Sequence, residues 1–271
     1  MDMLQKLKNG QNVYGTCFTS PAPGWAPVIK SAGLDFAFID TEHTALNRAE
    51  MARMCQHMQA YGITPIVRIP SPDPFLACQC LDGGAKGVIA PYLETVEQIR
   101  ELVGATKFRP LKGEILQKVL RGEHVLSDEM KTYLNNYNKG NICIANIESV
   151  PALHRLNDLL SVPGLDAVFI GPHDLSISLG IPEQYDHPEF EKAVKYIIHT
   201  TRSKGLAIAI HFSLDPERQA KWVKEGANIV VHSTDRTLFS QKLNADINAI
   251  KTAVGDLKDP DTGEQEALPT I

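Results

Sequence analysis

The sequence lacks the features that mark several large protein classes. No stretch approaches the roughly 18 consecutive apolar residues of a membrane-spanning helix, and the N-terminal MDMLQKLKNG has no apolar signal-peptide core. Basic residues are not in excess, with 27 Lys and Arg against 32 Asp and Glu, and they form no cluster. Because nucleic-acid-binding proteins more often carry a clustered basic excess, we expect neither nucleic acid nor membrane as a partner.

Cysteines are few, and their spacing matches no disulfide scaffold. The five are an odd number. Cys78 and Cys80 form a C-x-C, which is neither a C-x-x-C redox pair nor one half of a zinc site whose second half is present. Free thiols are typical of a reducing compartment. We therefore predict a cytoplasmic protein without structural disulfides.

Short apolar runs are present in abundance. The chain has 271 residues, of which 43% are hydrophobic, a length that suits two domains or one α/β barrel of roughly 250 residues. The runs are rich in β-branched or aromatic residues and are continuous rather than alternating, which is typical of parallel strands buried on both faces. We expect eight strands, at residues 13–18, 35–39, 63–69, 87–90, 141–147, 167–170, 206–212 and 228–231.

Helical patterns lie between these runs. In one of them, Met51, Met54, Cys55 and Met58 fall at i, i+3, i+4 and i+7, on one face of a helix. A strand followed by a helix is a βα unit, and repeated units form a parallel sheet. About eight units in this length predict a closed (β/α)₈ TIM barrel that forms a single domain over residues 1–271.

Two segments depart from this repeat. Residues 108–140 are polar and rich in Lys, Arg and Glu, where a short loop would suffice. Connections of this length in compact domains often serve as lids, binding loops or subunit contacts, so we expect a lid-like insertion. Residues 255–271 are polar and contain two prolines. We expect them to form a C-terminal arm, either extended or disordered.

Polar side chains follow one apolar run after another. In a barrel of this kind the active site lies at the carboxyl ends of the strands. Each residue alone has an ordinary explanation, such as an ion pair at the rim or a buried structural histidine. Ionisable groups are costly in apolar surroundings, so it is the set that indicates a site: Asp40, Glu42, His43, Arg68, Asn146, Glu148, His173, Asp174, His211 and His232.

Glu148 and Asp174 are candidate metal ligands. They lie 26 residues apart, about one βα unit, so their carboxylates could converge from adjacent strands. Carboxylates without Cys or His nearby favour a hard divalent cation, and Mg²⁺ takes one or two of them and completes its shell with water and substrate oxygens. Two helix-capping acids are the structural alternative.

The D-x-E-H sequence from Asp40 to His43 suggests a general base. A carboxylate beside an imidazole can fix its tautomer and strengthen it as a base. The structural alternative is a polar turn that caps the helix at Asn47. Arg68 would add a permanent, forked cation able to hold a carboxylate or a developing oxyanion.

Five motifs in order resemble one family: FIDTEH at 38–43, IVR at 66–68, LDGGA at 81–85, NIE at 146–148 and FIGPHDLS at 169–176. Over roughly residues 10–250 the sequence is similar to the HpcH/HpaI family of class II, metal-dependent pyruvate aldolases, which act on 2-keto-3-deoxy and 4-hydroxy-2-oxo acids. The resemblance implies a phosphoenolpyruvate/pyruvate-type barrel. It also implies a last helix exchanged between subunits of a hexamer or trimer.

The resemblance assigns roles residue by residue. It implies that Glu148 and Asp174 hold a divalent metal, Mg²⁺ or Mn²⁺, with Co²⁺ as a third option. His43, supported by Asp40, would be the catalytic base. Arg68 would bind the keto or enolate oxygen of pyruvate.

The resemblance also implies a binding site for the pyruvate carboxylate, formed by the backbone around Gly171, Pro172, His173 and Asp174. Two departures concern the substrate side. Asn146 stands where relatives carry Gln, and His173 stands where they carry a small residue. The Gly/Arg-rich lid signature of the family is also poorly reproduced at 109–113. We therefore expect pyruvate chemistry to be retained and leave the aldehyde open.

The expected activity is that of a carbon–carbon lyase that reversibly cleaves a 4-hydroxy-2-oxo acid to pyruvate and an aldehyde. One alternative on the same barrel is an acyl-CoA lyase of the citrate-lyase-β or malyl-CoA type, with the basic segment 107–121 as its CoA-binding surface. Another is an oxaloacetate decarboxylase. A metabolite-binding barrel without catalysis is the remote alternative.

Overall fold

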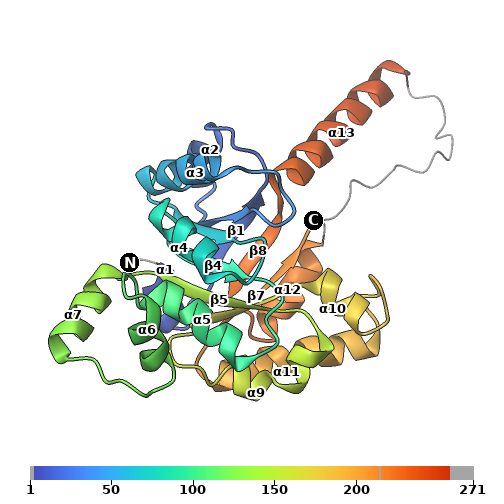
Figure 1. Ribbon diagram of the computed structural model, residues 1–271. Helices are drawn as coiled ribbons and strands as arrows, with labels where there is room; N and C mark the ends of the chain where they lie inside the picture. The colour runs from blue at the N-terminus through green and yellow to red at the C-terminus, as the bar shows by residue number, and fades with distance from the viewer. Residues whose placement is uncertain (1–2, 214, 257–271) are drawn as a thin grey trace.

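The computed structural model describes residues 3–213 and 215–256. Eight parallel strands close into a barrel in chain order, and β8 pairs with β1 (Figure 1). All eight expected runs are strands, with ends that differ by at most three residues, and the (β/α)₈ prediction is confirmed. The strands are β1 Val13–Phe18, β2 Phe36–Asp40, β3 Thr64–Arg68, β4 Gly87–Ala90, β5 Ile142–Ile147, β6 Ala167–Ile170, β7 Ala207–Phe212 and β8 Ile229–Thr234.

The strands are buried on both faces, which explains their continuous apolar runs. Phe38 and Ile66 belong to the cluster that fills the barrel, whereas Ile39 and Val67 belong to the layer between strands and helices. Successive side chains of a strand point to opposite faces, so a strand buried on both sides needs apolar residues at every position. Only the strand ends are free to carry charge.

Helices surround the barrel. The helix α5 begins with a capping box, in which the side chains of Thr95 and Gln98 each accept a hydrogen bond from the other residue's backbone N–H. The helices are α1 Met3–Lys8, α2 Trp25–Ser31, α3 Arg48–Ala60, α4 Pro74–Asp82, α5 Val96–Lys107, α6 Gly113–Leu120, α7 Asp128–Tyr137, α8 Val150–His154, α9 Leu156–Leu159, α10 Pro172–Ser178, α11 Pro188–Ser203, α12 Pro216–Lys224 and α13 Asp235–Val254.

Segment 108–140 lies at the amino end of the barrel, where it forms α6 and α7 beside α1 (Figure 1). The helix α5 returns the chain from the carboxyl end of β4 to the amino end of the barrel. The segment between α5 and β5 therefore lies at the end opposite the carboxyl ends of the strands. The Asn138 side chain fixes the segment by donating to the carbonyls of Lys107 and Arg109, at 2.9 and 2.7 Å. Within this subunit the segment therefore does not occupy the expected lid position.

The helix α13 projects from the barrel (Figure 1). Asp235, its first residue, is the only buried one in the helix as described. Its large exposed apolar residues are Leu238, Phe239, Leu243, Ile247, Ile250 and Val254. Gly255 ends the helix in the left-handed conformation, with φ of 80°. Of the expected C-terminal arm, residues 257–271 lie outside the described part of the chain.

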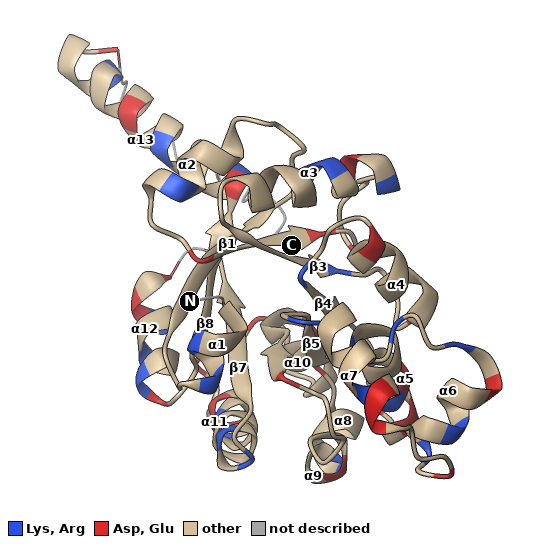
Figure 2. Ribbon diagram, turned by 90° about the vertical axis from the view of Figure 1, so that its left-hand side faces the viewer, with Lys and Arg blue, Asp and Glu red and all other residues tan. Residues whose placement is uncertain are grey.

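Charges of both signs are interspersed over the surface helices, as Figure 2 shows on α5, α6, α11 and α12. In residues 3–213 and 215–256, none of the helices combines the length and the hydropathy needed to cross a membrane.

Candidate active site

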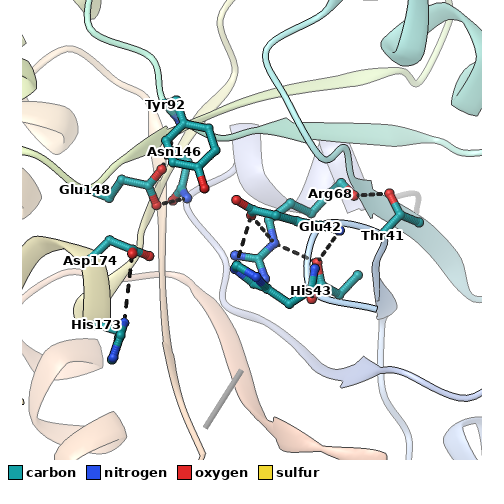
Figure 3. Close-up of polar contacts among 10 residues, drawn as sticks. Thr41, Glu42, His43, Arg68, Tyr92, Asn146, Glu148, His173 and Asp174 are labelled. Carbon is teal, nitrogen blue, oxygen red and sulfur yellow. Dashed lines mark hydrogen bonds and ion pairs between the residues drawn. The ribbon is translucent and has the colours of Figure 1, made fainter. Parts of the chain in front are cut away.

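The candidate residues come from successive strands and meet at the carboxyl end of the barrel (Figure 3). Asp40 and Arg68 are the last residues of β2 and β3, and Glu148 follows β5 directly. A cavity of about 700 Å³ opens there. Its lining includes His43, Arg68, Gly171, Pro172, His173, Asp174, Tyr185, His211, Phe212, Arg218 and Arg236.

Arg68 lies between two carboxylates. Asp40 and Arg68 are register neighbours on adjacent strands, and Arg68 Nε donates to Asp40 Oδ1 at 2.8 Å. Arg68 Nε is also 3.1 Å from Glu42 Oε2, and the three side chains are each at most 8% exposed. Burial opposes ionisation of Asp40, but the hydrogen bond and charge of Arg68 outweigh it and lower the pKa of Asp40. The cation is thus held in place by its partners.

His43 lies on the loop after β2, with its side chain 44% exposed. The backbone N–H groups of Glu42 and His43 donate to Asp40, at 3.1 and 3.4 Å. The imidazole Nε2 is 3.6 Å from Glu42 Oε2. Among the described residues no hydrogen bond joins Asp40 to the imidazole, so Asp40 supports the turn and the nearest carboxylate to the ring is Glu42.

Glu148 is a buried carboxylate without a basic partner in the described part of the chain. Its Oε1 accepts from the Tyr92 N–H at 2.9 Å, and its Oε2 accepts from Asn146 Nδ2. Burial raises the pKa of Glu148 to about 7, and although the Tyr92 hydrogen bond opposes this rise, the negative charges of Asp174 and Glu42 add to it. A cation near this carboxylate would restore its charged form.

Asp174 supplies the second carboxylate, from the first turn of α10 and 47% exposed. A Cβ on Gly171 would lie 2.7 Å from Glu148 Oε2, so a larger residue at this position would displace the carboxylate. No group of three or more His, Cys, Asp and Glu in the described chain is arranged to hold a metal. Two oxygen donors are what Mg²⁺ often takes from a protein.

The remaining predicted residues divide between cavity and interior. His173 lines the cavity, with Nε2 3.6 Å from Glu183 Oε1. Asn146 is fully buried and orients Glu148. His211 is 8% exposed, with Nε2 3.2 Å from the Ser233 carbonyl, and burial lowers the pKa of His211 to about 4. A neutral, buried His211 agrees with its structural interpretation.

Sequence reasoning missed Tyr92, which follows β4 and Pro91. Tyr92 has a left-handed backbone, with φ of 56°, an uncommon conformation for a residue with a side chain. Its phenolic group faces Glu42, and interaction with that carboxylate raises the pKa of Tyr92 to about 12. The available signal was its position directly after a strand, since polar residues stand at or after the ends of six other strands. Glu42 had been noted there without a role.

Comparisons with known proteins identify the family. The model of the HpcH/HpaI aldolase/citrate lyase family matches residues 19–241. A 2-keto-3-deoxy-L-rhamnonate aldolase of Salmonella gallinarum (strain 287/91 / NCTC 13346) is 30% identical over 250 residues, which are 91% of each chain.

Solved structures give the same result. An HpcH/HpaI aldolase from Desulfitobacterium hafniense DCB-2 superposes with a TM-score of 0.80 at 26% identity, covering 93% of this chain and 97% of that one. The citrate synthase SbnG superposes with a TM-score of 0.80 at 29% identity, covering 94% and 99%. This chain is a member of the HpcH/HpaI aldolase/citrate lyase family.

Proposed function

We propose that the protein is a divalent-metal-dependent aldolase that reversibly cleaves a 4-hydroxy-2-oxo acid, of the 2-keto-3-deoxy type, into pyruvate and an aldehyde. The observation that carries the proposal is Glu148, a buried carboxylate facing Asp174 with no basic partner in the described chain, beside the cavity that Arg68 and His43 line. The aldolase named above supports the 2-keto-3-deoxy class of substrate.

Glu148 and Asp174 would hold the metal, with Mg²⁺ or Mn²⁺ as first candidates and Co²⁺ as the third. The fit rests on two hard oxygen donors and on the raised pKa of Glu148, which indicates negative charge without compensation. When bound, a divalent ion acts as a Lewis acid that stabilises negative charge developing on the keto oxygen of the substrate.

Arg68 would add a second positive contact to the same oxygen. Asp40 and Glu42 fix its guanidinium, so it need not reorganise as charge develops, and a preorganised donor of this kind is worth roughly 3–4 kcal/mol. His43 would take the proton of the C4 hydroxyl. The electron pair of the C3–C4 bond then passes to C3 and the enolate, the aldehyde leaves, and His43 returns the proton to C3 to give pyruvate.

The backbone at Gly171, Pro172, His173 and Asp174 would bind the pyruvate carboxylate, with Asn146 supporting Glu148 from behind. Oligomerisation and location stay part of the proposal. The exposed apolar face of α13 supports a last helix exchanged between copies in a hexamer or trimer. All five cysteines are free, in keeping with a cytoplasmic protein.

The test is pyruvate release from a panel of 2-keto-3-deoxy and 4-hydroxy-2-oxo acids, before and after exhaustive chelation. We expect activity to vanish on chelation and to return with Mg²⁺, Mn²⁺ or Co²⁺. Glu148→Gln should abolish both activity and rescue, whereas Glu97→Gln on exposed α5 is the matched control and should keep both. Full activity of the chelated wild type would contradict the proposal.

A second candidate rests on the likeness to the citrate synthase SbnG. It retains the barrel and changes the substrate to an acyl-CoA thioester, or to oxaloacetate as in a decarboxylase. The basic segment 107–121, which would bind CoA, begins at the end of α5 and therefore lies at the opposite end of the barrel from the site. Adding malyl-CoA, read by its product glyoxylate, and oxaloacetate to the panel separates these activities. Pyruvate release from any hydroxy-oxo acid excludes a barrel that only binds metabolites.

A further inference from the structure

Glu42 presents a buried oxygen that lacks a hydrogen bond. Its side chain is 7% exposed, and Oε2 has no hydrogen-bond partner among the described residues. Arg68 Nε is 3.1 Å away, but its single N–H is already donated to Asp40 at 2.8 Å. A buried acceptor without a donor is costly, and His43 Nε2 lies 3.6 Å from this oxygen.

Asp40 hydrogen-bonds other groups than the imidazole in the described part of the chain. Its Oδ1 accepts from Arg68 Nε and from the N–H of Glu42, and its Oδ2 accepts from the N–H of His43. The side chain is fully buried. Asp40 therefore shapes the turn that places Glu42 and His43 side by side, and it anchors the arginine.

Tyr92 holds Glu42 from the other side of the barrel mouth. Figure 3 shows its ring between Glu148 and Glu42. The left-handed backbone at Tyr92 directs its N–H to Glu148, while its phenolic group faces Glu42, whose carboxylate raises the pKa of Tyr92 to about 12. A strained backbone of this kind persists only where the surrounding contacts enforce it, and here both contacts lie in the site.

We propose that Glu42, held by Tyr92, is the positioning carboxylate for His43. Glu42 Oε2 accepts the Nε2–H of the imidazole, which leaves Nδ1 as the proton acceptor. Asp40 and Glu42 together outweigh the charge of Arg68 by one negative charge, so the imidazolium that forms when Nδ1 takes a proton finds its counter-charge already in place. This inference rests on the proposed function for the role of His43.

The test compares Glu42→Gln with Asp40→Asn and reads the tautomer of His43 by ¹⁵N NMR of the imidazole, together with kcat and KM for pyruvate release. In the wild type we expect the Nε2–H tautomer. Glu42→Gln should mix the tautomers and lower kcat by about 10²–10³-fold, because the base is no longer oriented. Its KM should stay within about threefold, since His43 reacts in the chemical step. Asp40→Asn should keep the tautomer and raise KM, because it loosens Arg68.

Tyr92→Phe is the second variant and keeps the proposal testable should Glu42→Gln fail to fold. It retains the ring and the backbone N–H and removes only the hydroxyl, so we expect the same tautomer change with a kcat loss of about tenfold. If Glu42→Gln folds and the tautomer of His43 is unchanged, the proposal is overturned. If Glu42→Gln does not fold, an unchanged tautomer in Tyr92→Phe overturns it. A change of tautomer in Asp40→Asn alone also overturns it. The NMR readout needs no turnover, so wild-type protein that releases no pyruvate would contradict only the proposed function.

Discussion

The two halves of the site treat buried charge in opposite ways. Over β2 and β3, Arg68 lies between Asp40 and Glu42, and the pKa of Asp40 is lowered despite complete burial. Over β5 and β6, neither Glu148 nor Asp174 pairs with a lysine or arginine of the described chain, and burial raises the pKa of Glu148 to about 7. The difference is the presence of one guanidinium. The carboxylates of the first half have their counter-charge within the protein, whereas under the proposed function those of the second half would receive it from a bound cation.

The largest effect should come from breaking the compensated half. Arg68→Met leaves two buried carboxylates without their cation, and removing one partner of a buried pair typically costs about 3–5 kcal/mol. Urea unfolding of metal-free protein at pH 7 measures this loss. Arg100→Met removes a solvent-exposed i,i+3 pair with Glu97 and should change the free energy of unfolding by less than about 1 kcal/mol. Equal stabilities of the two variants would show that the buried arrangement does not depend on its arginine.

His211 packs against Phe38, beside the half that contains Arg68, and makes the free energy of unfolding depend on pH. Burial lowers the pKa of His211 to about 4 from its ordinary 6.5. The neutral ring therefore contributes stability that is present above pH 6.5 and is lost as the pH falls through about 4. The wild type should lose about 3 kcal/mol over this window that His211→Gln does not lose.

Urea unfolding at pH 7 and pH 4.5 measures the difference. His199→Gln, at an exposed position of α11, is the control and should follow the wild type. Parallel pH dependence of wild type and His211→Gln would contradict the neutral, buried state of His211.

The fold was predictable because strands buried on both faces need apolar residues on both, and runs such as 167–170 report this directly. The candidate residues of the site were also recognisable, because each follows such a run. Their pairing was not. Only the strand register makes Arg68 a neighbour of Asp40, and no spacing in the sequence distinguishes Asp40 from Glu42 as the neighbour of the imidazole.

The position of segment 108–140 was also beyond the sequence. Its composition resembles that of a lid, and only the return of the chain through α5 shows that it lies at the amino end. Tyr92 was missed for a related reason. Its role depends on its left-handed backbone φ, which the sequence Pro91-Tyr92-Leu93 does not predict.

The smallest predicted effect probes the uncompensated half without removing any charge. A Cβ on Gly171 would meet Glu148 Oε2 at 2.7 Å and Glu148 Cβ at 3.2 Å. The φ of Gly171 is −85°, which any residue adopts, so Gly171→Ala acts by displacing the carboxylate rather than by straining the backbone. We expect Mn²⁺ to bind about tenfold more weakly, equivalent to about 1.4 kcal/mol, with little change in thermal stability.

Titration calorimetry with Mn²⁺ measures this affinity. Gly24→Ala is the matched control, because a Cβ there meets nothing within 4 Å. Should Gly171→Ala bind Mn²⁺ as tightly as Gly24→Ala, Glu148 would not be the ligand that the open half of the site presents, and the contrast between the two halves would have to be explained without a metal.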